Sequence, residues 1–124
     1  MDYQFSVPAL PREELSPNSR FHRYAKWTAT AADISDVIGA FLQTYPRPER
    51  LLERATLDIH VIQRFKRKAD LDNMTARCKG FIDGLKGLVL LDDSAAVVGS
   101  LTVRISADKA LGPATIITIS EVGG

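Results

Sequence analysis

Two aspartates, Asp70 and Asp72, stand two positions apart in the segment KADLDN, directly after a cationic run. Along an extended chain, residues i and i+2 point to the same side, roughly 6.6 Å apart at ~3.3 Å per residue. Carboxylates that close repel each other, and both stay ionised only when a cation lies between them. A hard divalent ion such as Mg²⁺ binds one or two carboxylates together with water and phosphate oxygens. The spacing therefore predicts a divalent metal site at this pair.

The residues after Asp72 predict a helix that adds a lysine to the same side. At about 100° per residue, the side chains of Asp72, Ala76, Lys79 and Asp83 fall within about 40° of one direction. Lys79 would then stand two turns along from Asp72, where it reaches a bound phosphate or a leaving oxygen. The alternative is an exposed polar face with a Lys79–Asp83 pair that contributes about 0.3 kcal/mol.

Two further acids, Asp92 and Asp93, lie in the segment LLDDS just before a predicted strand. If that strand lies beside the strand preceding Asp70, its start brings one of these acids to the first pair. The alternative is a turn, because Asp and Ser favour turn positions. Three converging acids and a lysine suit metal-assisted cleavage of a phosphodiester, in which the metal activates water and stabilises the leaving oxygen. The lysine would add positive charge where negative charge develops.

Basic residues form two groups that the net charge of +1 conceals. Such groups bind phosphates in a salt-dependent way and carry no sequence information. The alternative is that each is a solvated surface. The residues expected to contact DNA are Arg20, His22, Arg23 and Lys26 in the first group and Arg64, Lys66, Arg67 and Lys68 in the second.

Hydrophobic periodicity predicts the elements that position these residues. Alternation indicates strands, 3.6-residue spacing indicates helices, and prolines mark the loop between the first strand and first helix. Trp27 is expected to anchor the first helix in the core. The fold class expected is α+β, a single domain over residues 1–124, with a mixed four-stranded sheet and two helices packed on it. In the order β-α-β-α-β-β, the elements are expected at 3–7, from 27 to about 45, 55–65, about 72–86, 95–106 and 114–122.

Composition fits one compact domain, with 124 residues of which 45% are hydrophobic. No apolar run approaches the roughly 20 residues of a membrane helix, and the N-terminus lacks the features of a signal peptide. The single cysteine, Cys78, cannot form an internal disulfide and lies on the apolar side of its helix. A cytoplasmic protein with no membrane contact is expected.

The segment DLDNMTARCKGFIDGLKGLVLLDDSAAVVG, residues 70–99, resembles the RusA-like endodeoxyribonucleases, which resolve Holliday junctions. It is similar to the family pattern of D-x-D-N, a lysine, D-x-L after three intervening residues, D-D and a valine-rich strand. LSPNSRFHR, residues 15–23, is similar to the S-x-N-x-R-x-H segment of phage-borne members, and ITISEVGG, residues 117–124, resembles the C-terminal strand. The resemblance spans nearly the whole chain in the right order.

The resemblance implies roles for individual residues. Asp70, Asp72 and Asp93 match the metal-binding and catalytic carboxylates, and Lys79 matches the catalytic lysine. Asp92 is a possible fourth ligand or, as we favour, an outer hydrogen-bond acceptor. Five residues separate Asn73 from Lys79, against two in the founding bacterial type, so Lys79 and Arg77 both stay open as the functional cation. Asn18 and Arg20 match the N-terminal loop that touches DNA.

The resemblance also implies a homodimer that needs Mg²⁺, or Mn²⁺ in its place, and nicks two opposed strands of a four-way junction. A two-fold dimer fits a substrate that needs two symmetric cuts, because one chain carries one acid cluster. The function expected is a Mg²⁺-dependent endonuclease for branched DNA in recombination and repair, with no organic cofactor. The alternatives are a catalytically inactive protein that binds branched DNA, and a domain whose charges only solvate it.

Overall fold

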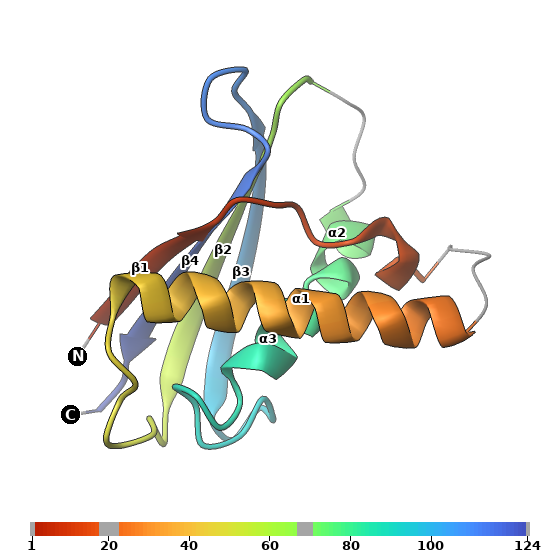
Figure 1. Cartoon of the computed structure of the whole chain (residues 1–124). Helices are drawn as coiled ribbons and strands as arrows, with labels where there is room; N and C mark the ends of the chain where they lie inside the picture. Colours follow the sequence, from red (N-terminus) through yellow and green to blue (C-terminus); the bar gives the residue numbers. More distant parts are fainter. Residues whose placement is uncertain (1, 18–22, 67–70, 124) are drawn as a thin grey trace.

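The computed structural model describes residues 2–17, 23–66 and 71–123, which form one α+β fold (Figure 1). The fold class and the order of elements agree with the sequence-based expectation. The sheet has four strands in the order β1-β4-β2-β3, and it is mixed because β2 pairs with β3 in parallel and with β4 antiparallel. The elements are β1 (Asp2–Val7), the 3₁₀ turn η1 (Glu13–Leu15), α1 (Arg23–Thr44), β2 (Ala55–Gln63), α2 (Leu71–Arg77), α3 (Lys79–Leu85), β3 (Val98–Ala107) and β4 (Ala114–Glu121).

The core lies between the sheet and the helices on one of its faces. Alternate residues of the central strand β2, such as Leu57 and Ile59, are fully buried, as the alternation in the sequence predicts. Phe41 of α1 packs its ring edge-on against Tyr3 and Phe5 of β1, with ring centroids 5.3 and 5.4 Å apart. These contacts fix α1 across the sheet (Figure 1).

The second predicted helix is divided at Cys78 into α2 and α3. Cys78 has φ −73° and ψ −4°, and its N–H contacts the carbonyl oxygens of both Met74 and Thr75 at 3.2 Å. Two glycines then let α3 pack closely on α1. A Cβ atom at Gly80 would lie 2.7 Å from Cβ of Asp33, and one at Gly84 would lie 2.2 Å from Val37 Cγ1. The continuous face predicted from Asp72 to Asp83 is therefore interrupted.

Two expectations about single residues have different outcomes. Trp27 does not anchor α1 in the core, because its residue surface is 73% exposed. Ala29, Val37 and Phe41 provide the buried side of α1 instead. Cys78 is fully buried as expected, and burial raises the pKa of its thiol to about 12. Within the three described ranges, no helix combines the length and apolar character needed to cross a membrane.

Candidate functional site

Asp83 of α3 and Asp93 of the loop between α3 and β3 bring their carboxyl groups together. The loop is held in place by main-chain hydrogen bonds to Leu52, whose N–H donates to Val89 O at 2.7 Å and whose oxygen accepts from Leu91 N at 2.9 Å. Burial raises the pKa of Asp83, and a hydrogen bond with Asp93 and the negative charge of Asp93 raise it further. Two acids ten positions apart in the chain therefore interact directly.

The raised pKa of Asp83 reflects the closeness of the two carboxyl groups. Two carboxyl groups in hydrogen-bonding distance repel each other when both are ionised, which favours the protonated form of one of them. The hydrogen bond with Asp93 therefore raises the pKa of Asp83. A divalent cation between the two groups would relieve their repulsion, because carboxylate oxygens are the ligands that Mg²⁺ prefers.

Two lysines lie beside this pair. Lys79 is the exposed first residue of α3, one turn before Asp83, and its positive charge lowers the pKa of Asp83. The positive charge of Lys86 also lowers the pKa of Asp83. The Nζ atom of Lys86 lies 3.2 Å from Oδ1 of Asp92. Hydrogen bonds from Lys86 and Ser94 lower the pKa of Asp92. Asp92 is thus paired with a lysine, whereas Asp93 is paired with an acid.

Asp72 lies in the first turn of α2 with an exposed surface, and Asp70 lies outside the described residues. Among the residues that the structure describes, no three Asp, Glu, His or Cys side chains come together as a group that could hold a metal. Asp72 therefore does not complete a set with Asp83 and Asp93. The predicted set of Asp70, Asp72 and Asp93 stays a prediction.

The register of the sheet explains why the strands alone do not gather these acids. The third strand does lie beside the second, but it runs parallel to it, with Val98 paired to Ala55 and Ala107 paired to Gln63. The start of β3 is therefore beside the start of β2 and not beside its exit, which leads toward Asp72. The path of α2 and α3 sets where Asp93 lies.

The structure places four of the predicted DNA-contact residues at two surfaces. Arg23 and Lys26 lie in the first turn of α1, and Arg64 and Lys66 follow β2 directly. The Arg64 guanidinium carbon lies 5.5 Å from the centroid of the Phe65 ring, and Phe65 is 54% exposed. The other predicted contacts lie outside the described residues, namely Asn18, Arg20, His22, Arg67 and Lys68.

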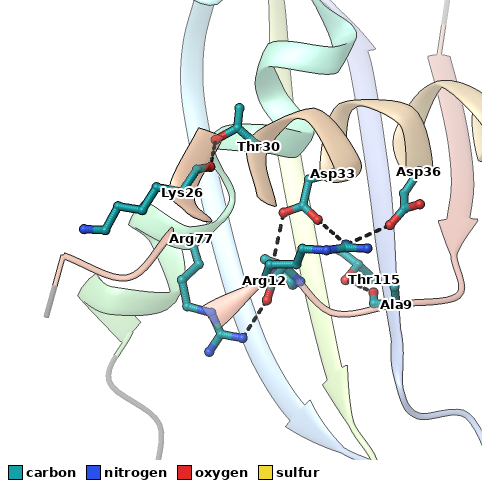
Figure 2. Close-up of polar contacts among 9 residues, drawn as sticks. Ala9, Arg12, Lys26, Thr30, Asp33, Asp36, Arg77 and Thr115 are labelled. Carbon is teal, nitrogen blue, oxygen red and sulfur yellow. Dashed lines mark hydrogen bonds and ion pairs between the residues drawn. The ribbon is translucent and has the colours of Figure 1, made fainter. Parts of the chain in front are cut away.

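Two arginines fix the N-terminal segment that leads toward Asn18 (Figure 2). Arg12 Nη1 donates to Asp33 Oδ1 at 2.7 Å and to Asp36 Oδ2 at 3.0 Å, both on α1. Arg77 Nη2, at the end of α2, donates to the carbonyl oxygen of Pro11 at 2.6 Å, and its buried Nε has no partner among the described residues. Arg77 is thus engaged with the main chain, whereas Lys79 is exposed beside Asp83.

Sequence reasoning missed Asp83 as a partner of Asp93 and missed the Arg12 ion pair. The signal for Asp83 was present, since it lies on the predicted Lys79 face, but it indicated only an i, i+4 pair with that lysine. Arg12 and Asp33 are separated by 21 positions and share no motif. No local pattern would have joined them.

No family model matches the chain, and no curated protein matches it in sequence. The resemblance over residues 70–99 therefore rests on its motif residues. Of these, all but Asp70 lie within the described ranges, including Asp72, Lys79, Asp92 and Asp93.

Proposed function

We propose that this protein is a Mg²⁺-dependent endonuclease that resolves four-way DNA junctions by paired nicks. The observation that carries the proposal is the contact between the Asp83 and Asp93 carboxyl groups beside Lys79. A paired-acid and lysine arrangement of this kind suits phosphodiester hydrolysis with a bound cation. The order of the motif residues over 70–99 supports the same chemistry.

The donor set fits a hard divalent ion. Asp83 and Asp93 offer carboxylate oxygens, and a bound divalent ion would relieve the repulsion that raises the pKa of Asp83. Asp70 and Asp72 stay proposed ligands through the resemblance alone, because Asp72 does not group with Asp83 and Asp93 among the described residues. We expect Mn²⁺ to substitute for Mg²⁺. When bound, the ion would neutralise the nonbridging phosphate oxygens and acidify the attacking water.

The protein's own residues have separate tasks in this proposal. Lys79 holds a phosphate oxygen and stabilises the negative charge that develops during cleavage. Arg23, Lys26, Arg64 and Lys66 bind the DNA backbone, which the acid pair would otherwise repel. Pairing two chains about a two-fold axis supplies two sites for two symmetric nicks.

The second candidate is a protein that binds branched DNA without cutting it. The observation that favours it is that the described residues bring two acids together and not three. Both candidates share the basic surfaces and differ only in what the acids do. They are therefore separated by cleavage and not by binding.

The experiment incubates a synthetic four-way junction with the protein, with and without Mg²⁺, beside a linear duplex of the same sequence. We expect Mg²⁺-dependent cutting of the junction alone and its loss in Asp93→Asn. Asp58→Asn is the matched control, because Asp58 lies on the face of the sheet away from the helices and pairs with Arg104 at 3.3 Å. Junction binding without cutting by the wild type would establish the second candidate, and equal cutting of the duplex would exclude junction specificity.

A further inference from the structure

The N-terminal part of α1 exposes two aromatic rings. Trp27 is 73% exposed and Tyr24 is 70% exposed, the highest values among the large hydrophobic residues in the described ranges. They are three positions apart on a helix, so their side chains lie on neighbouring turns of one side. Single exposed apolar residues are common, but two adjacent large rings on one rigid element indicate a contact surface.

The charged residues nearest to these rings along α1 are basic. Arg23 is exposed one turn before Trp27 on the same side of α1, and Lys26 is a half-buried residue about 100° around the helix from Trp27. The first turn of α1 contains no acidic residue. The nearest acids along the helix, Asp33 and Asp36, are already paired with Arg12. The Lys26 side chain extends away from that network toward the outside of the molecule (Figure 2).

The apolar part of this surface is short. The next residues along the same side of α1 are Thr28 and Ala31, which are polar or small. A helix that lies in a membrane surface, or in a groove of a partner protein, presents an apolar stripe over several turns. Two rings flanked by two cations fit a different partner, in which flat apolar groups alternate with negative charges.

We propose that Trp27 and Tyr24 form a stacking platform for unpaired bases of single-stranded DNA, with Arg23 and Lys26 binding the adjacent phosphates. Aromatic side chains stack on the π-face of any base, and neighbouring cations follow the backbone. The inference rests on the proposed function in that it names which part of a branched DNA this surface holds. It requires only binding and no cleavage, so the two can fail separately.

Trp27 is the single tryptophan of the chain, so its fluorescence reports contact at this surface directly. Titration of the whole protein with oligo(dT) at low salt should quench that fluorescence. An abasic oligonucleotide of the same length carries the same charge without bases, and it should bind more weakly and quench little. Equal quenching by the abasic strand and by oligo(dT) would overturn stacking. Stacking would also be overturned if anionic lipid vesicles quench the fluorescence and oligo(dT) does not.

Variants test the same surface through the anisotropy of a labelled oligo(dT). Trp27→Ala should weaken binding by about tenfold, and Trp27→Phe should keep most of the affinity, because a ring remains. Leu111→Ala is the matched control, since Leu111 is 64% exposed on the β3–β4 hairpin and should have no effect. Unchanged affinity in Trp27→Ala, with a circular dichroism spectrum like that of the wild type, would overturn the proposal.

Stacking through Trp27 and junction cleavage give separate readouts. If the wild type binds oligo(dT) through Trp27 but cuts no junction, stacking stands and the nuclease proposal fails. If junctions are cut while oligo(dT) leaves the fluorescence of Trp27 unchanged, the nuclease proposal stands and stacking fails. Self-association that buries Trp27 without DNA, seen as a concentration-dependent blue shift, would also overturn stacking.

Discussion

Arg12 Nη1 lies 2.7 Å from Oδ1 of Asp33, a side chain with no exposed surface, and ties the N-terminal segment to the middle of α1. The Arg12 main-chain N–H donates to the other oxygen of the same carboxylate at 3.2 Å. Burial raises the pKa of Asp33, and these bonds from Arg12 act against that shift. The segment that leads to the predicted DNA-contact loop is therefore held by a partly buried ion pair.

Arg12→Ala should lower the free energy of unfolding by about 3 kcal/mol at pH 7, because it leaves a buried carboxylate without its cation. A carboxyl whose folded-state pKa is raised stabilises the fold below its unfolded pKa, and loses that contribution as pH rises through the folded-state value. The deficit of the variant should therefore shrink as pH falls toward 4. Urea unfolding at several pH values measures it.

Arg50→Ala is the control for the Arg12 prediction. It removes an ion pair of similar length, 3.0 Å to Glu121, in which the arginine side chain is 66% exposed. Exposed pairs contribute little, so this variant should change stability far less than Arg12→Ala. Equal effects of the two substitutions would contradict a special role for the Arg12–Asp33 pair.

Gly84→Ala should destabilise the protein by about 1–3 kcal/mol, because the new methyl group would lie 2.2 Å from Val37 Cγ1 and 3.2 Å from main-chain atoms of Ile34. Gly39→Ala on α1 is the matched control, since nothing lies within 4 Å of its added Cβ. That change should stabilise α1 by about 0.5–1 kcal/mol through helix propensity. Thermal unfolding of both variants tests how closely α3 packs on α1, and a neutral Gly84→Ala would argue against this packing.

The sequence predicted the elements well because their signals are local. Alternation along β2 and the apolar spacing of α1 follow from which side of each element is buried. The close packing of Gly80 and Gly84 on α1, directly after the break at Cys78, is a contact between distant segments. The parallel register of β3 also depends on tertiary structure. So does the exposure of Trp27, because an apolar ring at a helical spacing predicts a core position whether or not another element covers it.

In the candidate site, too, the residue types are local information and their pairing depends on tertiary packing. The types of Lys79, Asp83 and Asp93 are visible in the sequence, and so is the expectation that acids gather near a lysine. Which acid pairs with Asp93 depends on how the loop after α3 is held against Leu52 by main-chain hydrogen bonds. A motif specifies residues at spacings along the chain, whereas the pairing of carboxyl groups depends on the packing of the helices.

Asp83→Asn should change how stability depends on pH. Burial and Asp93 raise the folded-state pKa of Asp83 above its ordinary value of 3.8. This carboxyl therefore favours the folded state most at acid pH, and the contribution is lost as pH rises through the folded-state pKa. Asp83→Asn should remove this loss of stability with rising pH. The variant should then be more stable than the wild type at pH 7 without metal. Urea unfolding between pH 4 and pH 7.5 measures the slope, and an unchanged slope would argue against the acid pair.

Mg²⁺ should raise the melting temperature of the wild type at pH 7, because an ion that binds only the folded state stabilises it by mass action, about 2.7 kcal/mol at a hundred times the Kd. Asp93→Asn should lose most of this rise. Asp58→Asn should keep it, because Asp58 pairs with Arg104 on the far face of the sheet. A rise of equal size in all three proteins would place the bound ion elsewhere.

Lys79→Met and Arg77→Met should separate the two candidate cations. Lys79 is exposed beside Asp83, so its replacement should lower the rate of junction cleavage by about 10²- to 10³-fold and leave the melting temperature unchanged. Arg77 donates to Pro11 O at 2.6 Å, so its replacement should lower stability by about 1–3 kcal/mol.

Arg47→Met is the control for the Lys79→Met and Arg77→Met substitutions, because Arg47 is an exposed cation in the loop between α1 and β2. It should alter neither cleavage nor melting. Single-turnover cleavage and thermal unfolding, measured on the same preparations, distinguish a cation that acts on the phosphate from one that holds the main chain. A group that acts on the substrate lowers the cleavage rate without lowering stability. If Lys79→Met cleaves fully and a stably folded Arg77→Met does not cleave, Arg77 is the functional cation in place of Lys79.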